Sequence, residues 1–219
     1  MNGFFVTGSD TGVGKTFIGC QLVTQLRRSG LSLKVRKPVE SGCEMTGDGR
    51  LVGRDGEALF AANGRRESLD IVNPYRFQAA LAPDRAARLA GHRLTLEQLK
   101  QAARNQINED DRVLVEGAGG FCSPIAEDAL NADLACRLGL PVIIVVDDRL
   151  GAINQALMTI GAVTARALTV AAVILNQRQQ PSTDGAEDDM DNLGDLRRHS
   201  ELPIYACPHH GQLPLVDLL

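Results

Sequence analysis

The stretch Gly8-Ser-Asp-Thr-Gly-Val-Gly-Lys-Thr16 decides the fold of this chain. An apolar run, Phe4-Phe5-Val6, precedes it, and a segment with helical periodicity from Thr16 to Arg28 follows it. Strand, glycine-rich loop and helix in this order are typical of a phosphate-binding P-loop. The strict pattern G-x-x-x-x-G-K-[ST] would place its first glycine at position 9, where Ser9 stands, so the sequence predicts a variant P-loop.

The residue types of this loop suit an anionic ligand. Consecutive backbone N–H groups in such a loop point inward and form an anion nest, and the N-terminus of the following helix adds a partial positive charge. Lys15 supplies a full positive charge, and the Thr16 hydroxyl is placed to contact Mg²⁺. The stretch therefore predicts a site for a nucleotide and its magnesium ion.

Composition fits one α/β domain spanning residues 1–219. Apolar residues make up 44% of the 219 and charged residues 23%, which is ordinary for a globular protein. The net charge of −4 predicts no general attraction to nucleic acid or to an anionic membrane. Five scattered cysteines without metal spacing, and no apolar run long enough to cross a membrane, predict a soluble cytoplasmic protein with reduced thiols.

Hydrophobic patterning predicts strands that alternate with helices, and therefore a doubly wound, mostly parallel sheet flanked by helices. The expected strands cover residues 3–7, 33–36, 112–116, 142–146, 170–175 and 204–206. The expected helices cover residues 16–28, 57–62, 96–107, 133–138 and 152–166, and Thr95 with Gln98 forms a capping box for the third. Residues 40–56 are expected to form a loop, residues 63–95 to be irregular, and residues 178–195 to be mobile or marginally helical.

Polar or glycine residues follow the predicted strands directly: Gly8, Lys37, Glu116, Asp147 and Asn176. In parallel α/β sheets, ligands bind beyond the carboxyl ends of the strands. We therefore expect these five residues to meet at one edge of the sheet.

Three of the charged candidates each have a plainer alternative. Glu116 could be a Walker-B type acid that holds Mg²⁺, or a solvated acid at a strand end; the adjacent Gly117-Ala-Gly-Gly120 favours the first, because glycines permit close approach to a ligand. Asp55 could be a further Mg²⁺ ligand or a helix N-cap. Lys37, stiffened by Pro38, could hold a phosphoryl group or a second anion, or could be a surface lysine.

Four other residues are less distinctive. Ser41 is a hydrogen-bond donor to a substrate or an ordinary loop serine. The Asn176 amide could read an adenine edge, although asparagine is common where strands end. His209-His210 is expected in an exposed tail and not as a metal pair. No Ser/His/Asp or Cys/His arrangement indicates covalent nucleophilic catalysis.

Several motifs together resemble the dethiobiotin synthetase family. They are the P-loop, then Lys37-Pro-Val-Glu-Ser-Gly42, then Val115-Glu-Gly-Ala-Gly-Gly120, with Asn73-Pro-Tyr75, Ala82-Pro83, Gly151-Ala-Ile-Asn154 and Asn176. The resemblance runs in unbroken order from about residue 3 to residue 177. Its specific part is the pairing of Lys-Pro-x-x-Ser-Gly with Val-Glu-Gly-Ala-Gly-Gly.

This resemblance implies an ATP- and Mg²⁺-dependent ligase of biotin synthesis. Such an enzyme closes a ureido ring on 7,8-diaminopelargonic acid with CO₂, giving dethiobiotin, ADP and phosphate. One amine becomes a carbamate, the carbamate oxygen attacks the γ-phosphate, and the second amine displaces phosphate. The family also implies a homodimer with substrate near the interface.

The resemblance also implies residue roles. Lys37 and Lys15 are the implied catalytic residues, and Thr16, Asp55 and Glu116 the implied Mg²⁺ ligands. Thr11 and Ser41 would contact the carbamate or diamine, while Gly151 and Asn154 would reach the carboxylate of substrate held by the partner subunit. The implied nucleotide contacts are Gly12, Val13, Gly14, Lys15, Thr16, Phe17, Asp55, Glu116, Gly117, Ala118, Gly119, Asn176 and Gln177.

The chain departs from the family pattern in its tail. Members usually carry a Gly-x-Ile-Pro-like element that contacts the base, where this chain has Cys207-Pro-His-His-Gly211. Two other classes remain as alternatives. A P-loop ATPase switch of the partitioning type usually carries an early loop lysine where this chain has Asp10. An amidotransferase-type ligase usually has a separate glutaminase part, for which 219 residues leave no room.

Overall fold

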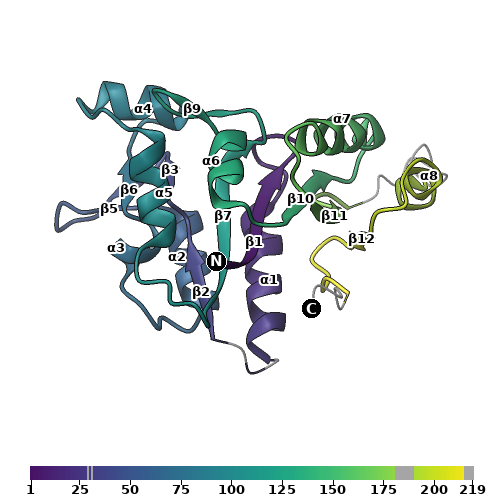
Figure 1. The fold of residues 1–219 in the computed structure, drawn as a ribbon, viewed down its shortest axis with the longest axis horizontal. Helices are drawn as coiled ribbons and strands as arrows, with labels where there is room; N and C mark the ends of the chain where they lie inside the picture. The colour runs from purple at the N-terminus through teal and green to yellow at the C-terminus, as the bar shows by residue number, and fades with distance from the viewer. Residues whose placement is uncertain (29, 31, 181–189, 215–219) are drawn as a thin grey trace.

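The computed structural model describes residues 1–28, 30, 32–180 and 190–214. Within them, six parallel strands form one sheet in the order β12-β11-β10-β1-β7-β2, which confirms the predicted fold class (Figure 1). The strands are β1 (Asn2–Gly8), β2 (Leu33–Arg36), β7 (Arg112–Gly120), β10 (Val142–Asp147), β11 (Val170–Asn176) and β12 (Ile204–Cys207).

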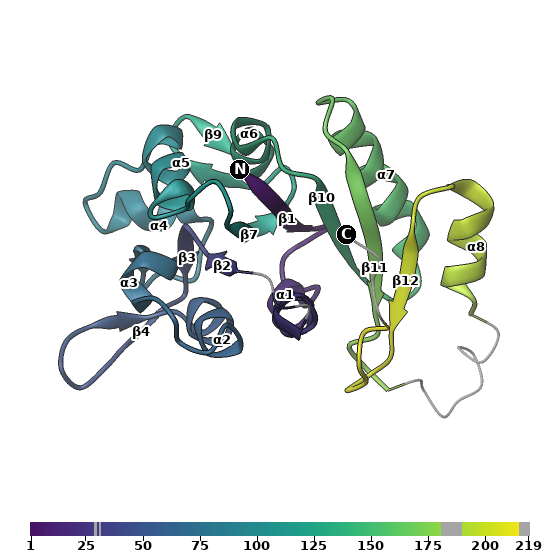
Figure 2. The same ribbon diagram turned by 60° about the horizontal axis from the view of Figure 1, so that its bottom comes forward.

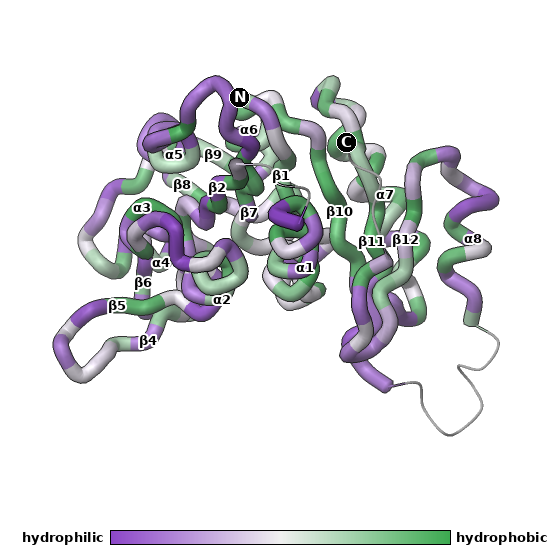
Figure 3. Tube along the Cα trace, turned by 90° about the horizontal axis from the view of Figure 1, so that it is seen from below, coloured by the Kyte–Doolittle hydropathy of each residue, from purple (hydrophilic) through white to green (hydrophobic). Residues whose placement is uncertain are grey.

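The central strands are apolar on both faces because helices cover both. Helices α1 (Lys15–Arg28) and α2 (Arg54–Ala62) lie on one side of the sheet. Helices α5 (Leu96–Arg104), α6 (Asn131–Leu138) and α7 (Ala152–Thr164) lie on the other, as Figure 2 shows, and α8 (Asn192–His199) packs on β12 at the edge. In Figure 3, β10 is hydrophobic along its length, whereas α8 carries hydrophilic segments. Two buried clusters follow from this layering, one on each face of the sheet.

The order of the strands brings the predicted strand-end residues to one edge of the sheet. Strand β1 lies in the middle, with β7 on one side and β10 on the other. The P-loop after β1 is therefore flanked by Glu116 in β7 and by the residues that follow β10. Strand β2, which ends just before Lys37, lies next to β7, so Lys37 reaches the same edge.

Two expectations about loops were wrong. Residues 40–56 contain parts of β3 (Val39–Ser41), the hairpin β4 (Glu44–Met45) and β5 (Leu51–Val52), and the start of α2. Residues 63–95 contain α3 (Leu69–Val72), β6 (Tyr75–Phe77) and α4 (Pro83–Leu89). These elements are too short for hydrophobic periodicity to show them, and β3 pairs with β6 across more than thirty residues of sequence.

The remaining expectations were close. The Thr95–Gln98 capping box is present, but its helix ends at Arg104, so Ile107 lies beyond it. Strand β7 continues past residue 116, where the expected strand ended, through the glycines to Gly120. A small hairpin follows it, β8 (Pro124–Ala126) with β9 (Ala129–Leu130). Residues 181–189 of the segment expected to be mobile lie outside the described residues, and its last part, from Asn192, begins α8.

Candidate functional site

The P-loop is held open between β1 and α1 by glycines and by the neighbouring strands. Gly12 and Gly14 have φ values of +77° and +90°, a backbone region that only glycine adopts without strain. The Ser9 N–H donates to the Val145 carbonyl, and the Phe121 N–H donates to the Gly8 carbonyl. The loop is therefore fixed on both sides by the sheet and leaves its own N–H groups for an anion.

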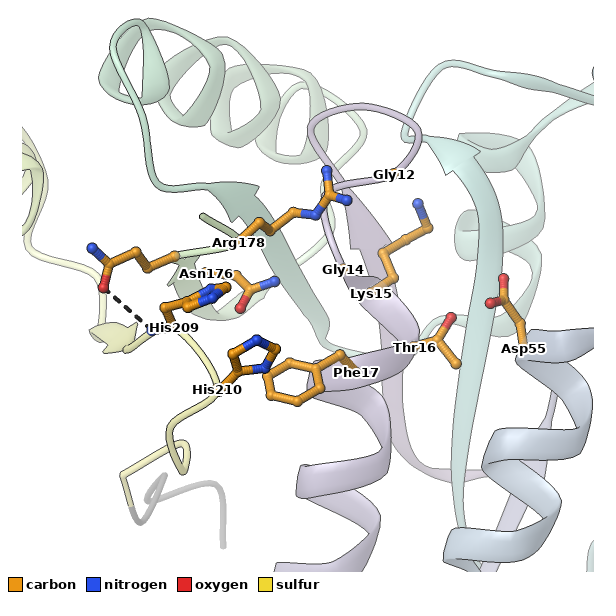
Figure 4. Close-up of a pocket in the computed structure, with 11 residues that line it drawn as sticks. Gly12, Gly14, Lys15, Thr16, Phe17, Asp55, Asn176, Arg178, His209 and His210 are labelled. Carbon is orange, nitrogen blue, oxygen red and sulfur yellow. Dashed lines mark hydrogen bonds between the residues drawn. The ribbon is translucent and has the colours of Figure 1, made fainter. Parts of the chain in front are cut away.

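A cavity of about 360 Å³ lies over this loop (Figure 4). Its lining comes from the P-loop and start of α1, from α2, from the end of β11 and from the segment after β12: Gly12, Gly14, Lys15, Thr16, Phe17, Asp55, Asn176, Gln177, Arg178, His209 and His210. The cavity joins the anion nest to a partly apolar side bounded by Phe17 and the two histidines. This shape and chemistry suit a ligand with a charged end and a flat aromatic end.

Next to the cavity, Lys37 sits between two carboxylates. Its ammonium Nζ lies 2.6 Å from Glu116 Oε1 and 3.0 Å from Asp55 Oδ2, and it also donates to the Gly117 carbonyl at 3.1 Å. The Thr16 hydroxyl donates to the same Glu116 oxygen at 2.8 Å. Lys37, Glu116, Asp55 and Thr16 are hereafter the lysine–carboxylate cluster.

Burial makes this cluster strongly coupled. Lys37 is 2% exposed and Glu116 0%, so neither is the surface residue of the plainer alternatives. Burial lowers the pKa of Lys37, but the negative charges of Glu116, Asp55 and Glu40 outweigh it and raise that pKa above its ordinary value. Lys37 is therefore a permanently charged group at neutral pH.

The backbone of Lys37 is also fixed. Its N–H donates to the Val72 carbonyl at 2.7 Å, and its own carbonyl accepts from the Asn73 side chain at 2.7 Å. Asn73 belongs to the Asn73-Pro74-Tyr75 motif, so that motif acts here by positioning Lys37.

Lys15 stands in a different electrostatic environment. Burial, and then repulsion from Lys37, lower its pKa to about 8, against the attraction of Glu116, Asp55 and Asp10. Its Nζ donates to the Asp10 carbonyl at 3.2 Å across the mouth of the loop. An anion bound in the loop would restore the full charge of Lys15.

Asp55 is not the helix N-cap that the sequence left open. The N-terminus of α2 is capped by the Glu40 carboxylate, which accepts from the N–H groups of Asp55 and Gly56 at 2.9 Å each. The Asp55 carboxylate is thereby free to face Lys37, and its side chain is 42% exposed to the cavity side.

The comparisons with known proteins agree with this geometry. A family model described as an AAA domain matches residues 2–216. The ATP-dependent dethiobiotin synthetase BioD of Phenylobacterium zucineum is 41% identical over 219 residues, which covers 96% of this chain and 90% of that protein. The enzyme of the same name from Ruthia magnifica is 37% identical and covers 93% and 90%.

The chain belongs to the dethiobiotin synthetase family. Its members are ATP-dependent ligases of biotin biosynthesis. Among solved structures, the septum site-determining protein MinD of Pyrococcus horikoshii, complexed with Mg-ADP, has a TM-score of 0.56 at 17% identity, covering 95% of this chain and 82% of that one. The MinC:MinD complex of Aquifex aeolicus gives 0.56 at 16% identity, with the same coverage. These two likenesses show the P-loop NTPase fold and nothing finer.

The glycines after Glu116 have a structural reason within the protein itself. A Cβ on Gly117 would lie 2.4 Å from the Asn131 amide, and one on Gly119 would lie 2.5 Å from the Ser123 hydroxyl. The close approach is therefore made by the protein's own side chains, Asn131 at the start of α6 and Ser123 in the segment after β7. Gly117, Ala118 and Gly119 lie outside the cavity lining, and Ala118 is buried.

The end of β11 uses its amides for structure as well as for the cavity wall. The Asn176 side-chain nitrogen donates to the Val13 carbonyl at 2.9 Å, so this amide group holds the P-loop in place. The Gln177 side-chain oxygen accepts from the His209 N–H at 3.2 Å and so ties the tail to β11 (Figure 4).

Sequence reasoning missed three residues of the cavity: Arg178, His209 and His210. His210 is exposed, as expected for a tail, but both histidines face the cavity because β12 runs parallel to β11 and delivers the following segment to the same edge. The position of Arg178, two residues after a strand of a parallel sheet, was the available signal.

The residues expected to contact the diamine are not gathered in this cavity. Thr11 is exposed at the tip of the loop and Ser41 is half-buried at the end of β3. Gly151 and Asn154 are exposed at the N-terminus of α7. These four residues lie outside the lining of the cavity.

The described residues contain no group of three or more His, Cys, Asp or Glu side chains arranged to hold a metal ion. Over the same residues, no helix has the length and apolarity that a membrane crossing requires. A divalent ion at this site would therefore depend on Thr16, on two carboxylates and on oxygens of the ligand itself.

We predict that Lys37→Met lowers the free energy of unfolding by about 3 kcal/mol at pH 7, because Glu116 keeps a buried charge without its cation. Glu116→Gln in the same background should recover most of this loss. Lys37 also lowers the pKa of Asp55 against burial, so that pair stabilises the fold above the ordinary pKa of 3.8 and its contribution disappears as the pH falls below it. The deficit should therefore narrow only as the pH falls below about 4. Urea unfolding measures these losses, with Lys34→Met as the control. Lys34 is a half-exposed lysine that pairs with Glu67, so its replacement should cost under about 1 kcal/mol. Equal losses at both lysines would contradict the prediction.

Proposed function

We propose that this chain is a cytoplasmic ligase that uses ATP to close the ureido ring of dethiobiotin. Its substrates are 7,8-diaminopelargonic acid and CO₂, and its other products are ADP and phosphate. The observation that carries the proposal is Lys37, a buried ammonium held between Glu116 and Asp55 beside a P-loop cavity, in a chain of the dethiobiotin synthetase family. The reaction requires such a cation where an anionic carbamate meets a phosphoryl group.

The cavity supports a role for each end of the nucleotide. The P-loop N–H groups and Lys15 would hold the phosphates, in line with the loop geometry. Phe17, Asn176 and Gln177 line the other side, where the base would lie. Lys37 would bind the carbamate of the first amine and stabilise charge as the carbamate oxygen attacks the γ-phosphate. The second amine then attacks the carbonyl carbon of the mixed anhydride and expels phosphate.

Thr16, Asp55 and Glu116 are the residues that would hold Mg²⁺. They fit that ion because all offer oxygen, which Mg²⁺ prefers, and because Glu116 Oε2 is buried with no hydrogen-bond partner in the described structure. When bound, Mg²⁺ would neutralise charge on the phosphates. Lys37 hydrogen-bonds to both carboxylates of this set, so its positive charge would add to that of the ion.

We further propose that two copies pair through α7. Leu150, just before this helix, is 87% exposed and Met158 on it is 68% exposed, so both apolar side chains are open to a partner. Asn154 lies one helical turn from Met158, on the same face. A partner packed there would receive Asn154 and the α7 N-terminus, which suits a substrate carboxylate. The partner's Thr11 and the partner's Ser41 would contact the diamine of that same substrate molecule.

The decisive experiment is incubation of the protein with diaminopelargonate, bicarbonate and Mg-ATP. We expect dethiobiotin by mass spectrometry, one ADP for each product, and label in the ureido carbonyl from ¹³C-bicarbonate. Removal of Mg²⁺ with a chelator should stop the reaction, and replacement of the diamine by pelargonic acid should give no cyclic product. A folded protein that binds and hydrolyses Mg-ATP but forms no dethiobiotin would favour the ATPase switch.

Lys37→Met should lower the turnover number at least about a hundredfold, because one preorganised charge at a phosphoryl-transfer site is removed. Binding of Mg-ADP, measured by calorimetry below the unfolding temperature, should survive and shows that the site is formed. Lys34→Met, a lysine of β2 outside the cavity, is the matched control and should turn over normally. Near-normal ring closure by Lys37→Met would remove Lys37 from the reaction.

Sedimentation velocity tests the proposed dimer. The wild-type protein should sediment as a dimer, with twice the mass of one copy, which is 23.5 kDa. Met158→Glu should shift it toward the monomer, because a charge would be buried in the interface. Met45→Glu, at an exposed apolar residue on the distant β4–β5 hairpin, should leave the dimer intact. A wild-type monomer at micromolar concentration would contradict pairing through α7.

A further inference from the structure

Arg178 reaches over the P-loop from the opposite side to the lysine–carboxylate cluster. It follows β11 by two residues and lines the cavity together with Gly12 and Gly14. Its Nη1 lies 3.9 Å from the position that a Cβ on Gly12 would take, and its Cδ lies 4.0 Å from that position on Gly14. Figure 4 shows the guanidinium directed from the end of β11 toward the loop at Gly12.

This guanidinium is only weakly engaged within the described structure. Among the described residues its ion-pair partner is Asp147, whose Oδ2 lies 4.0 Å from Nη1, which is too long for a hydrogen bond. The same carboxylate oxygen lies closer, at 3.4 Å, to Arg149 Nε. The Arg178 side chain is 47% exposed, so its donors are available to a ligand in the cavity.

The two lysines of the site already have hydrogen-bond partners in this structure. Lys37 is committed to two carboxylates and a carbonyl. Lys15 donates to the Asp10 carbonyl, and burial lowers its pKa to about 8. An arginine, by contrast, stays charged at every physiological pH and offers a fork of donors that matches phosphate oxygens.

We infer that Arg178 is a phosphate-binding residue of this enzyme: its guanidinium donates to oxygens of the nucleotide's phosphate chain from the β11 side of the P-loop, and Asp147 is left to Arg149. The inference rests on the proposed function, since it takes the cavity over the P-loop to be the nucleotide site. It adds a residue that closes the anion site on the side where the loop has no charged side chain of its own.

Calorimetric titration with Mg-ADP, Mg-ATP and adenosine tests this inference without requiring ring closure. Arg178→Gln should weaken Mg-ADP and Mg-ATP binding about tenfold, the usual effect of losing a charge-assisted hydrogen bond, and should leave adenosine binding unchanged. Arg178→Lys should bind with intermediate affinity, because it keeps the charge but loses the fork. In turnover assays, the KM for ATP should rise more than the turnover number falls.

Arg149→Gln is the matched control. It removes the same charge beside the same carboxylate, but Arg149 lies outside the cavity lining. Its affinity for Mg-ADP should change less than about threefold, which separates a direct contact from a general loss of positive charge. The thermal unfolding temperature of each variant, measured alongside, should match that of the wild type.

Four outcomes overturn the inference. Equal losses for the two glutamine variants would show a general field effect, and an equal loss for adenosine would place Arg178 at the nucleoside. Unchanged Mg-ADP binding by Arg178→Gln, with normal binding by the wild type, would remove the phosphate contact while leaving the proposed function intact. A wild-type protein that binds no nucleotide would defeat both.

Discussion

The buried ion pair between Lys37 and Glu116, with Asp55 beside it, is the constraint around which the site is built. A charge removed from water must be paired and hydrogen-bonded. Here Lys37 follows β2 directly, Glu116 lies in β7 and Asp55 lies in α2. Asn73 and Val72 fix the Lys37 backbone, Glu40 turns α2 so that Asp55 faces the lysine, and Thr16 joins the cluster from α1. Such a pair is weak evidence for stability, since apolar residues could replace it. A role in the reaction explains the ion pair better than stability does, because the pair lies beside the end of the cavity that would take the phosphates.

The charge balance of this cluster explains why the site needs more cations than Lys37. Two carboxylates and one ammonium leave one negative charge beside a cavity that would take a polyphosphate. Lys37 alone therefore cannot make the region attractive to an anion. The P-loop N–H groups, Lys15 and a divalent ion on Thr16 and the carboxylates would reverse the local sign. Burial and Lys37 lower the pKa of Lys15 to about 8, so an anion bound beside it would raise that pKa and favour the charged lysine.

The sequence predicted the edge of the sheet better than it predicted the contacts made there. Apolar runs located β1, β2, β7, β10 and β11, and parallel topology then placed Gly8, Lys37, Glu116 and Asn176 together. It could not show that Glu40 caps α2 or that Asn131 packs on Gly117, because such contacts join distant residues and leave no periodic signal. The same holds for α3, β6 and α4: each is too short to display a period, and tertiary packing determines whether it forms. The individual residue roles came from the family resemblance and stay predictions.

The two sides of the cavity are built by different means. The phosphate side depends on the P-loop backbone and on the lysine–carboxylate cluster, where a buried charge makes each side chain depend on the others. The other side, where the base would lie, depends on the segment that β12 delivers next to β11, tied there by the Gln177–His209 hydrogen bond. That segment departs from the usual family element, yet the parallel pairing of β12 with β11 still carries it to the cavity. Its side chains line the cavity without entering the ion-pair network. If the cavity holds the nucleotide as proposed, substitutions there would change which base is accepted and leave the phosphate chemistry as it is.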